Sequence, residues 1–505
     1  MTALDAPRAS SWRSPIAHPL PWLLALAVAH VAVRVAVSPA LKADEAEQIL
    51  WSQHLQLGYG PQPPLYTWLQ WAVNQVLGYT VLAGAVLKHA LLVLTYTLIW
   101  LAGRELLGPR GAWWAAAGLM LLPPLGWYSI HGHSHTVLVT AMACGAWWLL
   151  LRIVRQPRPA QFAWLGLVCG LGMLSKYNFA LMALAMLLAA LSVPEARRAL
   201  LSRGWWWAPV VGALVVLPHA VWLLSHFGEA AMPTVNKMQI RSEHYLGEGL
   251  LSLLDVYARA FILWVLIALW AFRSAWWRGA VAPAVPWAQL VFWRYLALIT
   301  LALLSMVVLV GATDFKGRWV MPLLCMVPLA AFAARPELQD HPHSGRYTGA
   351  AIAAALVMLV AGGARPWVSG WSTEVGELNH PVVELGVALR EAGYDGRGRI
   401  IAADHMIAGM LRTRFPQATA SVCASVQDVP ACVAADIESA RRDGTGWLLF
   451  SRDDHTGTDW WEQAATVVPG LSVRSIELPF NMVPAGAPPA RYRYSWHPAT
   501  QGGER

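Results

Sequence analysis

The sequence predicts an α-helical polytopic membrane protein with about eleven transmembrane helices and a small C-terminal α/β domain. The 505-residue chain is 57% hydrophobic and only 13% charged, whereas soluble domains carry about 25% charged residues. Its apolar residues come in runs of roughly 18 to 24, the length that a helix needs to cross ~30 Å of hydrocarbon. The 29 Trp residues fit the same class, because indole prefers the headgroup region.

The expected spans follow one another from the N-terminus to about residue 364. The first apolar run is too long for a signal peptide and has no small-residue cleavage site, so we expect it to stay as an anchor. The segment 64–77 is apolar but short, and we expect it to form a helix at the interface or buried in protein. We expect spans at 19–39, 80–102, 111–128, 134–151, 160–175, 178–193, 206–226, 256–272, 295–312, 319–334 and 347–364.

The distribution of Lys and Arg predicts the orientation in the membrane. With the N-terminus inside, the cytoplasmic loops carry more than twice as many Lys and Arg residues as the opposite side, in agreement with the positive-inside rule. The first outer loop, residues 40–79, then faces outward. We therefore predict a multi-pass protein of the bacterial inner (cytoplasmic) membrane whose active site faces the periplasm. The net charge of +8 follows from this topology and does not indicate a nucleic-acid partner.

The composition changes after about residue 366, and we predict a domain boundary there between a membrane domain (1–366) and a soluble domain (367–505). Short apolar runs alternate with helical patterns in the second part, which favours an α/β domain. An odd number of spans places this domain in the periplasm. Cys423 and Cys432 would then lie in an oxidising compartment, where they could form a disulfide. The apolar runs are 399–403, 446–451 and 471–478, and the helical patterns are 382–392, 405–415 and 434–442.

Three carboxylates begin the first outer loop, in the stretch ADEAEQILWSQHLQLGYGPQPPLYTWLQ (43–70). The pattern predicts a helix from Asp44 to Leu57, closed by Gly58. In a structural interpretation, Asp44 is the N-cap and Glu47 completes a capping box. In a functional interpretation, Asp44 is a general base that takes a proton from an acceptor hydroxyl, and Glu45 binds a metal or orients the acceptor. The local pattern leaves both interpretations open.

Basic residues stand near the predicted outer ends of several spans. Lys176, Lys316 and Arg318 lie next to apolar sequence, where cations are costly and tend to be functional. A lipid phosphate would suit them, since Arg binds phosphate with two parallel hydrogen bonds and Lys supplies a point charge. The neighbouring Tyr177 could add a hydroxyl donor. In the structural alternative, these long side chains only reach the membrane interface and bind no ligand.

Three histidines alternate in the stretch SIHGHSHT (129–136), between the third and fourth predicted spans. His131, His133 and His135 can converge on a metal only if the segment is extended or turned. Alternatively they are interfacial side chains, with His133 and His135 lining an active site. A divalent metal ion is therefore one expectation from this segment.

Taken together, these motifs resemble the glycosyltransferase family 39 group, the protein mannosyltransferase-like and aminoarabinose transferase-like membrane enzymes of the GT-C fold. The resemblance covers about residues 20–335 and not the C-terminal tail. It is most specific in the first outer loop, and two later stretches match in the expected order. The matching features are Asp44-Glu45, Gly58-Tyr59, Pro63-Pro64-Leu65, GLGMLSKYNFAL (170–181) and DFKGRWVMP (314–322).

The resemblance implies an enzyme that transfers a hexosyl or pentosyl group, usually with inversion, from a polyprenyl-phosphate carrier to an envelope glycan, lipid or protein. It lets us assign roles to the candidate residues. Asp44 matches the catalytic base or acceptor-orienting acid, and Glu45 the second acid of the pair. The expected donor phosphate ligands are Lys176, Tyr177, Lys316 and Arg318, and the expected lining residues are Tyr59, Gln62, His133 and His135.

Two features depart from the family pattern. Several relatives have an acidic residue near the histidine segment, where none stands here, which puts metal dependence in doubt. Gln62 stands where lipid A-modifying relatives often have Lys, which weakens the case for a phosphorylated acceptor.

Two other classes of function compete with the transferase: a polyprenyl-lipid transporter or flippase, and a non-catalytic envelope scaffold. Transporters usually have inverted repeats with broken helices near the midplane, and we find no paired halves. The outer segment 228–254 is long enough to be a lid over the acceptor or a simple tether. For the C-terminal domain we expect an acceptor-binding or covering role.

Overall fold

The structure is a computed structural model, and it describes residues 18–230, 232, 243–276, 282–283, 285–371, 375–424, 428–453, 458–484 and 486–499. Lys237 and Arg241 of the long outer segment lie outside the described residues. The chain folds as two compact units. The first contains Met1–Ala29, Gln56–Tyr66 and Lys88–Met358, and the second contains His30–Leu55, Thr67–Leu87 and Leu359–Arg505.

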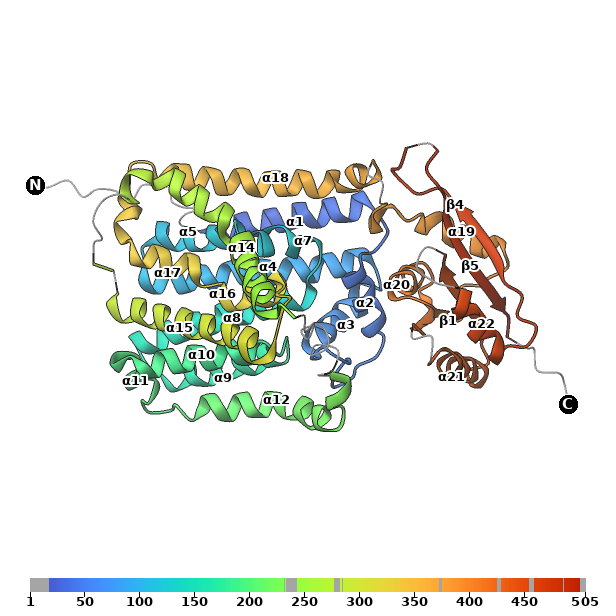
Figure 1. Cartoon of the computed structure of the whole chain (residues 1–505), viewed down its shortest axis with the longest axis horizontal. Helices are drawn as coiled ribbons and strands as arrows, with labels where there is room; N and C mark the ends of the chain where they lie inside the picture. The colour runs from blue at the N-terminus through green and yellow to red at the C-terminus, as the bar shows by residue number, and fades with distance from the viewer. Residues whose placement is uncertain are drawn as a thin grey trace, which may run out of the picture. The chain divides into compact units, whose positions relative to one another are not determined.

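The first unit is a bundle of helices, in which α8, α9, α10, α12 and α15 run along roughly the same direction (Figure 1). Among the described residues, eight helices of the chain are long and apolar enough to cross a membrane, or nine if the bent pair α10–α11 counts as one span. The protein is thus a multi-pass membrane protein, as predicted. The helices up to the end of α18 are α1 (Pro19–Val37), α4 (Val81–Leu106), α5 (Pro109–Met120), α6 (Pro123–Gly126), α7 (Tyr128–His131), α8 (Ser134–Arg155), α9 (Pro159–Met173), α10 (Phe179–Ser192), α11 (Pro194–Leu200), α12 (Trp207–Ser225), α14 (Tyr245–Trp276), α15 (Pro286–Ser305), η2 (Met306–Val310), α16 (Gly317–Leu324), α17 (Val327–Ala334), η3 (Pro336–Asp340) and α18 (Ser344–Gly370), with α2 and α3 described below.

In the part of the chain that the structure describes, fewer helices reach spanning length than the eleven expected, because some apolar segments are interrupted. The expected span 111–128 ends early at Met120, and Pro123 starts a new short helix since a proline ring cannot continue the preceding one. The expected span 160–175 is the 15-residue helix α9. Helices α10 and α11 are bent by 112° against each other at Val193.

The second unit contains a five-stranded mixed sheet with strand order β2-β1-β3-β5-β4, which confirms the predicted α/β fold. Strand β1 (Arg397–Ala402) is parallel to β2 (Gln417–Val422) and to β3 (Trp447–Arg452). Strand β5 (Ala490–His497) is antiparallel to β3 and to β4 (Arg474–Leu478). The side chains of β1 alternate between two hydrophobic cores, one on each face of the sheet.

Helices cover both faces of this sheet. Residues of α19 (Val382–Glu391) and α20 (His405–Arg414) belong to the first core. Residues of α21 (Val429–Arg442) and α22 (Thr458–Val467) belong to the second core. A short helix, η4 (Glu377–Asn379), precedes α19.

The first outer loop contributes a further helix to the first core. Helix α2 (Ala43–Trp51) packs beside α20 (Figure 1), and its residues Ala46, Ile49 and Leu50 are buried in the same core as the α20 side chains. Helix α3 (Leu65–Leu77) is the short helix expected at 64–77, and its buried Thr67 and Asn74 bond to side chains of α2 and of the turn that follows it. The acidic stretch is therefore part of one folded body with the C-terminal sheet.

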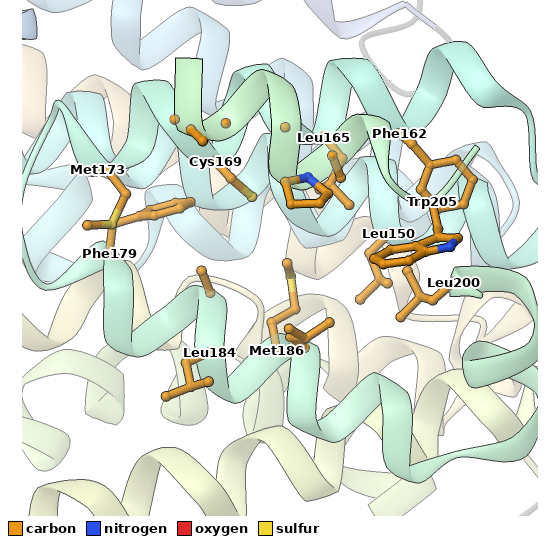
Figure 2. Close-up of a pocket in the computed structure, with 18 of the residues that line it drawn as sticks. Leu150, Phe162, Leu165, Cys169, Met173, Phe179, Leu184, Met186, Leu200 and Trp205 are labelled. Atoms are coloured by element: carbon orange, nitrogen blue, oxygen red, sulfur yellow. The ribbon is translucent and has the colours of Figure 1, made fainter. Parts of the chain in front are cut away.

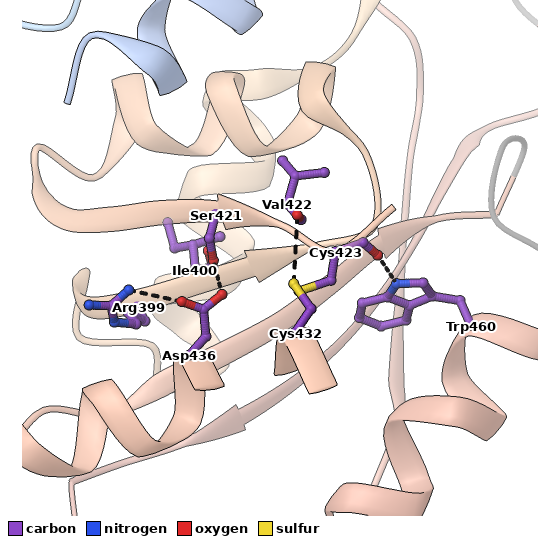
Figure 3. Close-up of a disulfide and its surroundings, with 8 residues drawn as sticks. All are labelled: Arg399, Ile400, Ser421, Val422, Cys423, Cys432, Asp436 and Trp460. Carbon is purple, nitrogen blue, oxygen red and sulfur yellow. Dashed lines mark hydrogen bonds and ion pairs between the residues drawn. A yellow bond between two sulfur atoms is a disulfide. The ribbon is translucent and has the colours of Figure 1, made fainter. Parts of the chain in front are cut away.

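Cys423 and Cys432 form a disulfide, which confirms that pairing. Figure 3 shows it beside Asp436 and Trp460. Asp436 accepts hydrogen bonds from Arg399 at 2.9 Å and from the Ser421 hydroxyl at 2.6 Å, and the Trp460 indole donates to the Cys423 carbonyl at 2.7 Å. The disulfide thus anchors the start of α21 to the end of β2.

Candidate active site

The predicted base, Asp44, stands in the first turn of α2, where it is half-buried. The N-cap is Lys42, and the Glu45 carboxylate accepts its backbone N–H at 3.0 Å. The predicted capping box, with Asp44 as N-cap and Glu47 as its partner, is therefore wrong. Asp44 instead occupies the second helical position, where the positive end of the helix dipole favours an ionised carboxylate.

Glu45, at the third helical position, is held in place for this hydrogen bond by Arg34. The Arg34 guanidinium donates to both Glu45 oxygens, at 3.1 and 2.6 Å. The same guanidinium donates to the carbonyls of Ser38 and Ala40, at 2.8 and 2.7 Å. Glu45, Arg34 and the turn between α1 and α2 thus form one partly buried network that fixes the start of the acidic helix.

The helix is also shorter than predicted, ending at Trp51 and not at Leu57. The Ser52 hydroxyl donates back to the Gln48 carbonyl, and such side-chain bonds compete with continued helix. The expected tight return of the chain is present: Tyr59 and Gln62 exchange two backbone hydrogen bonds, at 3.1 and 3.2 Å. Gly60 sits between them at a φ of +54°, a conformation that favours glycine.

Lys176, one of the predicted basic residues, contacts the backbone of a second one, Arg318, in the first unit. The Lys176 ammonium donates to the Thr136 hydroxyl at 2.9 Å and to the Arg318 carbonyl at 3.3 Å. The Thr136 hydroxyl in turn donates to the same carbonyl at 3.2 Å. Asn178 donates to the Trp319 carbonyl at 2.7 Å. These bonds join the start of α8, the turn between α9 and α10 and the start of α16, so the Lys176 ammonium lies against the backbone of Arg318. Lys176, Lys316 and Arg318 are called the basic cluster below.

A cavity of about 510 Å³ lies beside this cluster. Three predicted residues line it, namely His133, Lys316 and Arg318, and Lys316 pairs with Asp314 at 3.3 Å. The full lining is Pro124, Tyr128, His133, Ser252, Asp255, Val256, Arg259, Asp314, Phe315, Lys316, Gly317 and Arg318.

Three charged residues of this cavity, Asp255, Arg259 and Asp314, received no site role from the sequence. Asp255 and Arg259 lie one turn apart on α14 and form an ion pair at 2.7 Å. The sequence does contain a signal for Asp255 and Arg259: an acid and a base stand four positions apart in an otherwise apolar segment. Ionisable residues in such segments are candidates for a functional site.

The three histidines do not converge. His131 bonds the Trp127 carbonyl through Nδ1 at 2.8 Å, and the Nδ1 of His135 lies 3.4 Å from the Ser175 carbonyl oxygen. His133 adopts a left-handed backbone with φ of 62° as the N-cap of α8. Within the described part of the chain, the only trio spaced for a metal is Cys423, Cys432 and Asp436, and its sulfurs are joined in the disulfide. A divalent metal stays an expectation.

Tyr177 lies next to Lys176 in sequence but bonds elsewhere. Its hydroxyl and the His219 Nε2 are 3.2 Å apart, and His219 Nδ1 bonds the Leu57 carbonyl at 2.6 Å. Burial raises the pKa of Tyr177 to about 12, so it stays a neutral hydroxyl at physiological pH. The backbone N–H of Leu65 donates to the Leu174 carbonyl at 3.0 Å, so the segment 56–66, which carries Tyr59 and Gln62, is anchored to the same turn.

A second cavity, of about 610 Å³, is apolar (Figure 2). Its walls come from α8 to α12 and include Phe162, Leu165, Met173 and Phe179. It presents almost no polar group to a sugar or a phosphate, and among membrane helices its chemistry suits hydrocarbon chains.

Comparisons with known proteins agree with these motifs. A family model described as dolichyl-phosphate-mannose-protein mannosyltransferase matches residues 61–222. The lipopolysaccharide core galacturonosyltransferases RgtA and RgtB of Rhizobium johnstonii are 33% and 31% identical to this chain over 405 and 409 residues, which is 78% of this chain and 80% and 81% of the relatives. The lipid A galacturonosyltransferase RgtD of the same organism is 27% identical over 298 residues, 58% of this chain and 55% of that protein.

A solved structure supports the fold. The structure of ArnT from Cupriavidus metallidurans bound to undecaprenyl phosphate aligns with a TM-score of 0.62 and 13% identity, over 98% of this chain and 100% of that one. At this identity the likeness concerns the fold alone. The identity to RgtA extends over most of both chains, and the first-loop, 170–181 and 314–322 motifs have the family's order. The chain therefore belongs to the glycosyltransferase family 39 group and is a membrane glycosyltransferase with the GT-C fold.

Proposed function

We propose that this enzyme transfers a galacturonosyl group from a polyprenyl-phosphate carrier to the lipopolysaccharide core, on the periplasmic side of the bacterial inner membrane. The sugar and the acceptor are those for which RgtA and RgtB are named. A lipid-phosphate carrier agrees with the undecaprenyl phosphate that is bound to ArnT in its crystal structure. Membrane lipids would be the other partners of the apolar surface.

The observation that carries the proposal is the basic cluster of the first unit. Lys176 and Arg318 are linked through one carbonyl and one hydroxyl, and Arg318 and Lys316 line a cavity together. A departing lipid phosphate gains charge in the transition state, and prepositioned cations stabilise that charge more than they stabilise the bound donor. We assign Lys176, Lys316 and Arg318, with Tyr177 as a neutral hydroxyl, to the donor phosphate.

The reaction then proceeds by a single displacement. Asp44 takes the proton of the acceptor hydroxyl while the hydroxyl oxygen forms a bond to the anomeric carbon. The bond between that carbon and the phosphate oxygen breaks from the opposite side, so the configuration inverts and polyprenyl phosphate leaves as an anion. Glu45, held by Arg34, keeps α2 in place during this step. Tyr59, Gln62, His133 and His135 are assigned to the lining of the sugar and acceptor site.

Mass spectrometry of lipopolysaccharide tests the proposal. Cells that lack the gene are complemented with the native enzyme, with Asp44→Asn or with Glu47→Gln as a control on the same helix. We expect one hexuronic acid on the core with the native enzyme and the control. With Asp44→Asn we expect a loss of about 10²–10⁴-fold, the usual contribution of a general base, with normal membrane insertion.

Other results would change specific parts of the proposal. An added neutral hexose or pentose would replace the donor assignment, and a modified protein in place of the glycolipid would replace the acceptor. Retained transfer in Asp44→Asn would reject the base assignment while leaving the transferase activity in place.

A further inference from the structure

The backbones of helices α2 and α20 approach each other closely at Gly409 of α20, which faces Ala46 of α2. A Cβ added at Gly409 would lie 2.7 Å from both Cα and Cβ of Ala46 and 2.8 Å from its carbonyl oxygen. Two of these three atoms are backbone, so no side-chain rotation can relieve the overlap. Glycine at this position therefore fixes how closely the acidic helix approaches the C-terminal domain.

A residue just after the end of α2 binds the edge of the sheet. The Gln53 side chain accepts from the Ala420 backbone N–H at 3.0 Å and donates to the Ala420 carbonyl at 2.8 Å. Ala420 lies on β2, an edge strand, so a side-chain amide takes the place that a neighbouring strand would have. Arg412 of α20 also donates to Gln53, at 3.1 Å. The C-terminal end of α2 is thus tied to two elements of the domain.

The N-terminal end of the same helix is tied to η4. The Ser38 hydroxyl donates to the Leu378 carbonyl at 2.6 Å, and the backbone N–H of Ala43 donates to the Glu377 carboxylate at 3.4 Å. The contacts of the C-terminal domain therefore reach the residue next to Asp44.

We propose that the C-terminal α/β domain positions Asp44, with Gly409 and Gln53 as positioning residues for the base. The proposal rests on the proposed function, in which Asp44 accepts the proton. A nine-residue helix is marginal by itself in water, so the place of α2 is set by what it packs against. Since displacing a reacting group by about 1 Å can cost 10²-fold in rate, the domain acts as part of the catalytic apparatus.

A matched pair of glycine variants in the full-length enzyme tests this. Gly409→Ala places a methyl group against Ala46, whereas Gly386→Ala in α19 places one 3.7 Å from the nearest atom, in the Arg414 side chain. Both changes add the same group to a helix of the same domain. We expect kcat for Gly409→Ala to fall at least about tenfold with the donor KM unchanged, and Gly386→Ala to stay within about twofold of the native enzyme.

A second measurement separates positioning from general loss of folded enzyme. If Gly409 acts through Asp44, adding Asp44→Asn to Gly409→Ala costs less than it does in the native enzyme, because the base is already displaced. A purely structural defect leaves the cost of Asp44→Asn unchanged. Gln53→Ala, which removes the ties to Ala420 and Arg412, supplies a variant without any overlap should Gly409→Ala fail to fold.

The outcomes distinguish this inference from the proposed function. An inactive Asp44→Asn together with native kcat in Gly409→Ala and Gln53→Ala overturns the positioning role alone. An undiminished cost of Asp44→Asn in the Gly409→Ala and Gln53→Ala backgrounds overturns it as well. An active Asp44→Asn rejects the base itself, whatever the glycine variants do.

Discussion

The acidic helix and the basic cluster are held by different kinds of structure. Lys176 stands in the turn between α9 and α10, and Arg318 stands in the first turn of α16. The Lys176 ammonium donates to the Thr136 hydroxyl and to the Arg318 backbone carbonyl. Asp44 stands on a helix whose Ala46, Ile49 and Leu50 are buried in the core of the C-terminal α/β domain. Damage to the two regions should therefore have different kinetic effects. Changes in the bundle should act on the donor phosphate, and changes in the α/β domain on proton removal.

Apart from the loss expected for Asp44→Asn, the largest effect should come from the basic cluster. We expect Arg318→Ala to lower kcat/KM by about 10²–10³-fold, because a prepositioned donor to a developing anion is lost, and Arg318→Lys to recover part of it. Initial rates over a range of donor concentrations measure this. Arg294→Ala is the control, since Arg294 belongs to the same unit but does not line the cavity. A native rate in Arg318→Ala would remove this residue from the phosphate site.

The next effect concerns the attachment of the acidic helix. Arg34→Met leaves the Glu45 carboxylate and two carbonyls without the guanidinium, and the Arg34 and Glu45 side chains are only 12% and 9% exposed. Breaking such a pair should lower the free energy of unfolding by about 3 kcal/mol. Arg491→Met breaks a pair that is 60% and 54% exposed and should cost less than about 0.5 kcal/mol. Equal shifts in thermal unfolding would contradict the structural role of Arg34.

Strands of the α/β domain that coincide with an apolar run were predictable from the sequence, and the other two strands were not. The runs at 399–403 and 446–451 became β1 and β3. Strand β5, ARYRYSWH, was missed because Arg491 and Arg493 alternate with the buried Tyr492 and Tyr494, so no apolar run exists although the period of two is present. Strand β2, QATASV, is an edge strand of mostly small residues and carries little signal.

The site divides in the same way. Residue types and local spacing were enough to expect the Tyr59–Gln62 return, and they predict roles for Lys176 and Arg318, of which the variants above would test the role of Arg318. They could not predict that the Glu45 carboxylate accepts the N-cap N–H, because Arg34 reaches Glu45 across 11 positions and no local rule includes such a contact. Still less could they connect Gln53 with Ala420, 367 positions away. Contacts between distant segments decide such positions, and composition and periodicity contain no information about them.

Removing the disulfide tests whether both faces of the sheet in the α/β domain affect the base, or only the face that packs against α2. Replacing Cys423 and Cys432 by Ser should lower the free energy of unfolding by about 2.5 kcal/mol, the loop entropy for a short loop. Cys423 belongs to the core on the face of the sheet opposite to α2, so kcat well below the unfolding transition should not change. Thermal unfolding and initial rates measure the two quantities. A drop in kcat comparable to that of Gly409→Ala would mean that the whole domain, and not one face, controls the base.

The smallest expected effect is on how the stability of the α/β domain depends on pH. Burial lowers the pKa of His497 below its ordinary value of 6.5, so the folded domain holds it neutral, stacked on Trp447 with ring centroids 3.7 Å apart. As the pH falls below about 6.5, His497 binds a proton in the unfolded chain but not in the folded one, so the free energy of unfolding decreases. The decrease ends once the pH is below the lowered pKa that His497 has in the folded domain. In His497→Gln, the free energy of unfolding should fall less steeply as the pH is lowered from neutral. His54→Gln, an exposed histidine of the same unit, is the control. An unchanged pH dependence in His497→Gln would assign the acid sensitivity to other groups and leave the stacked pair a packing contact only.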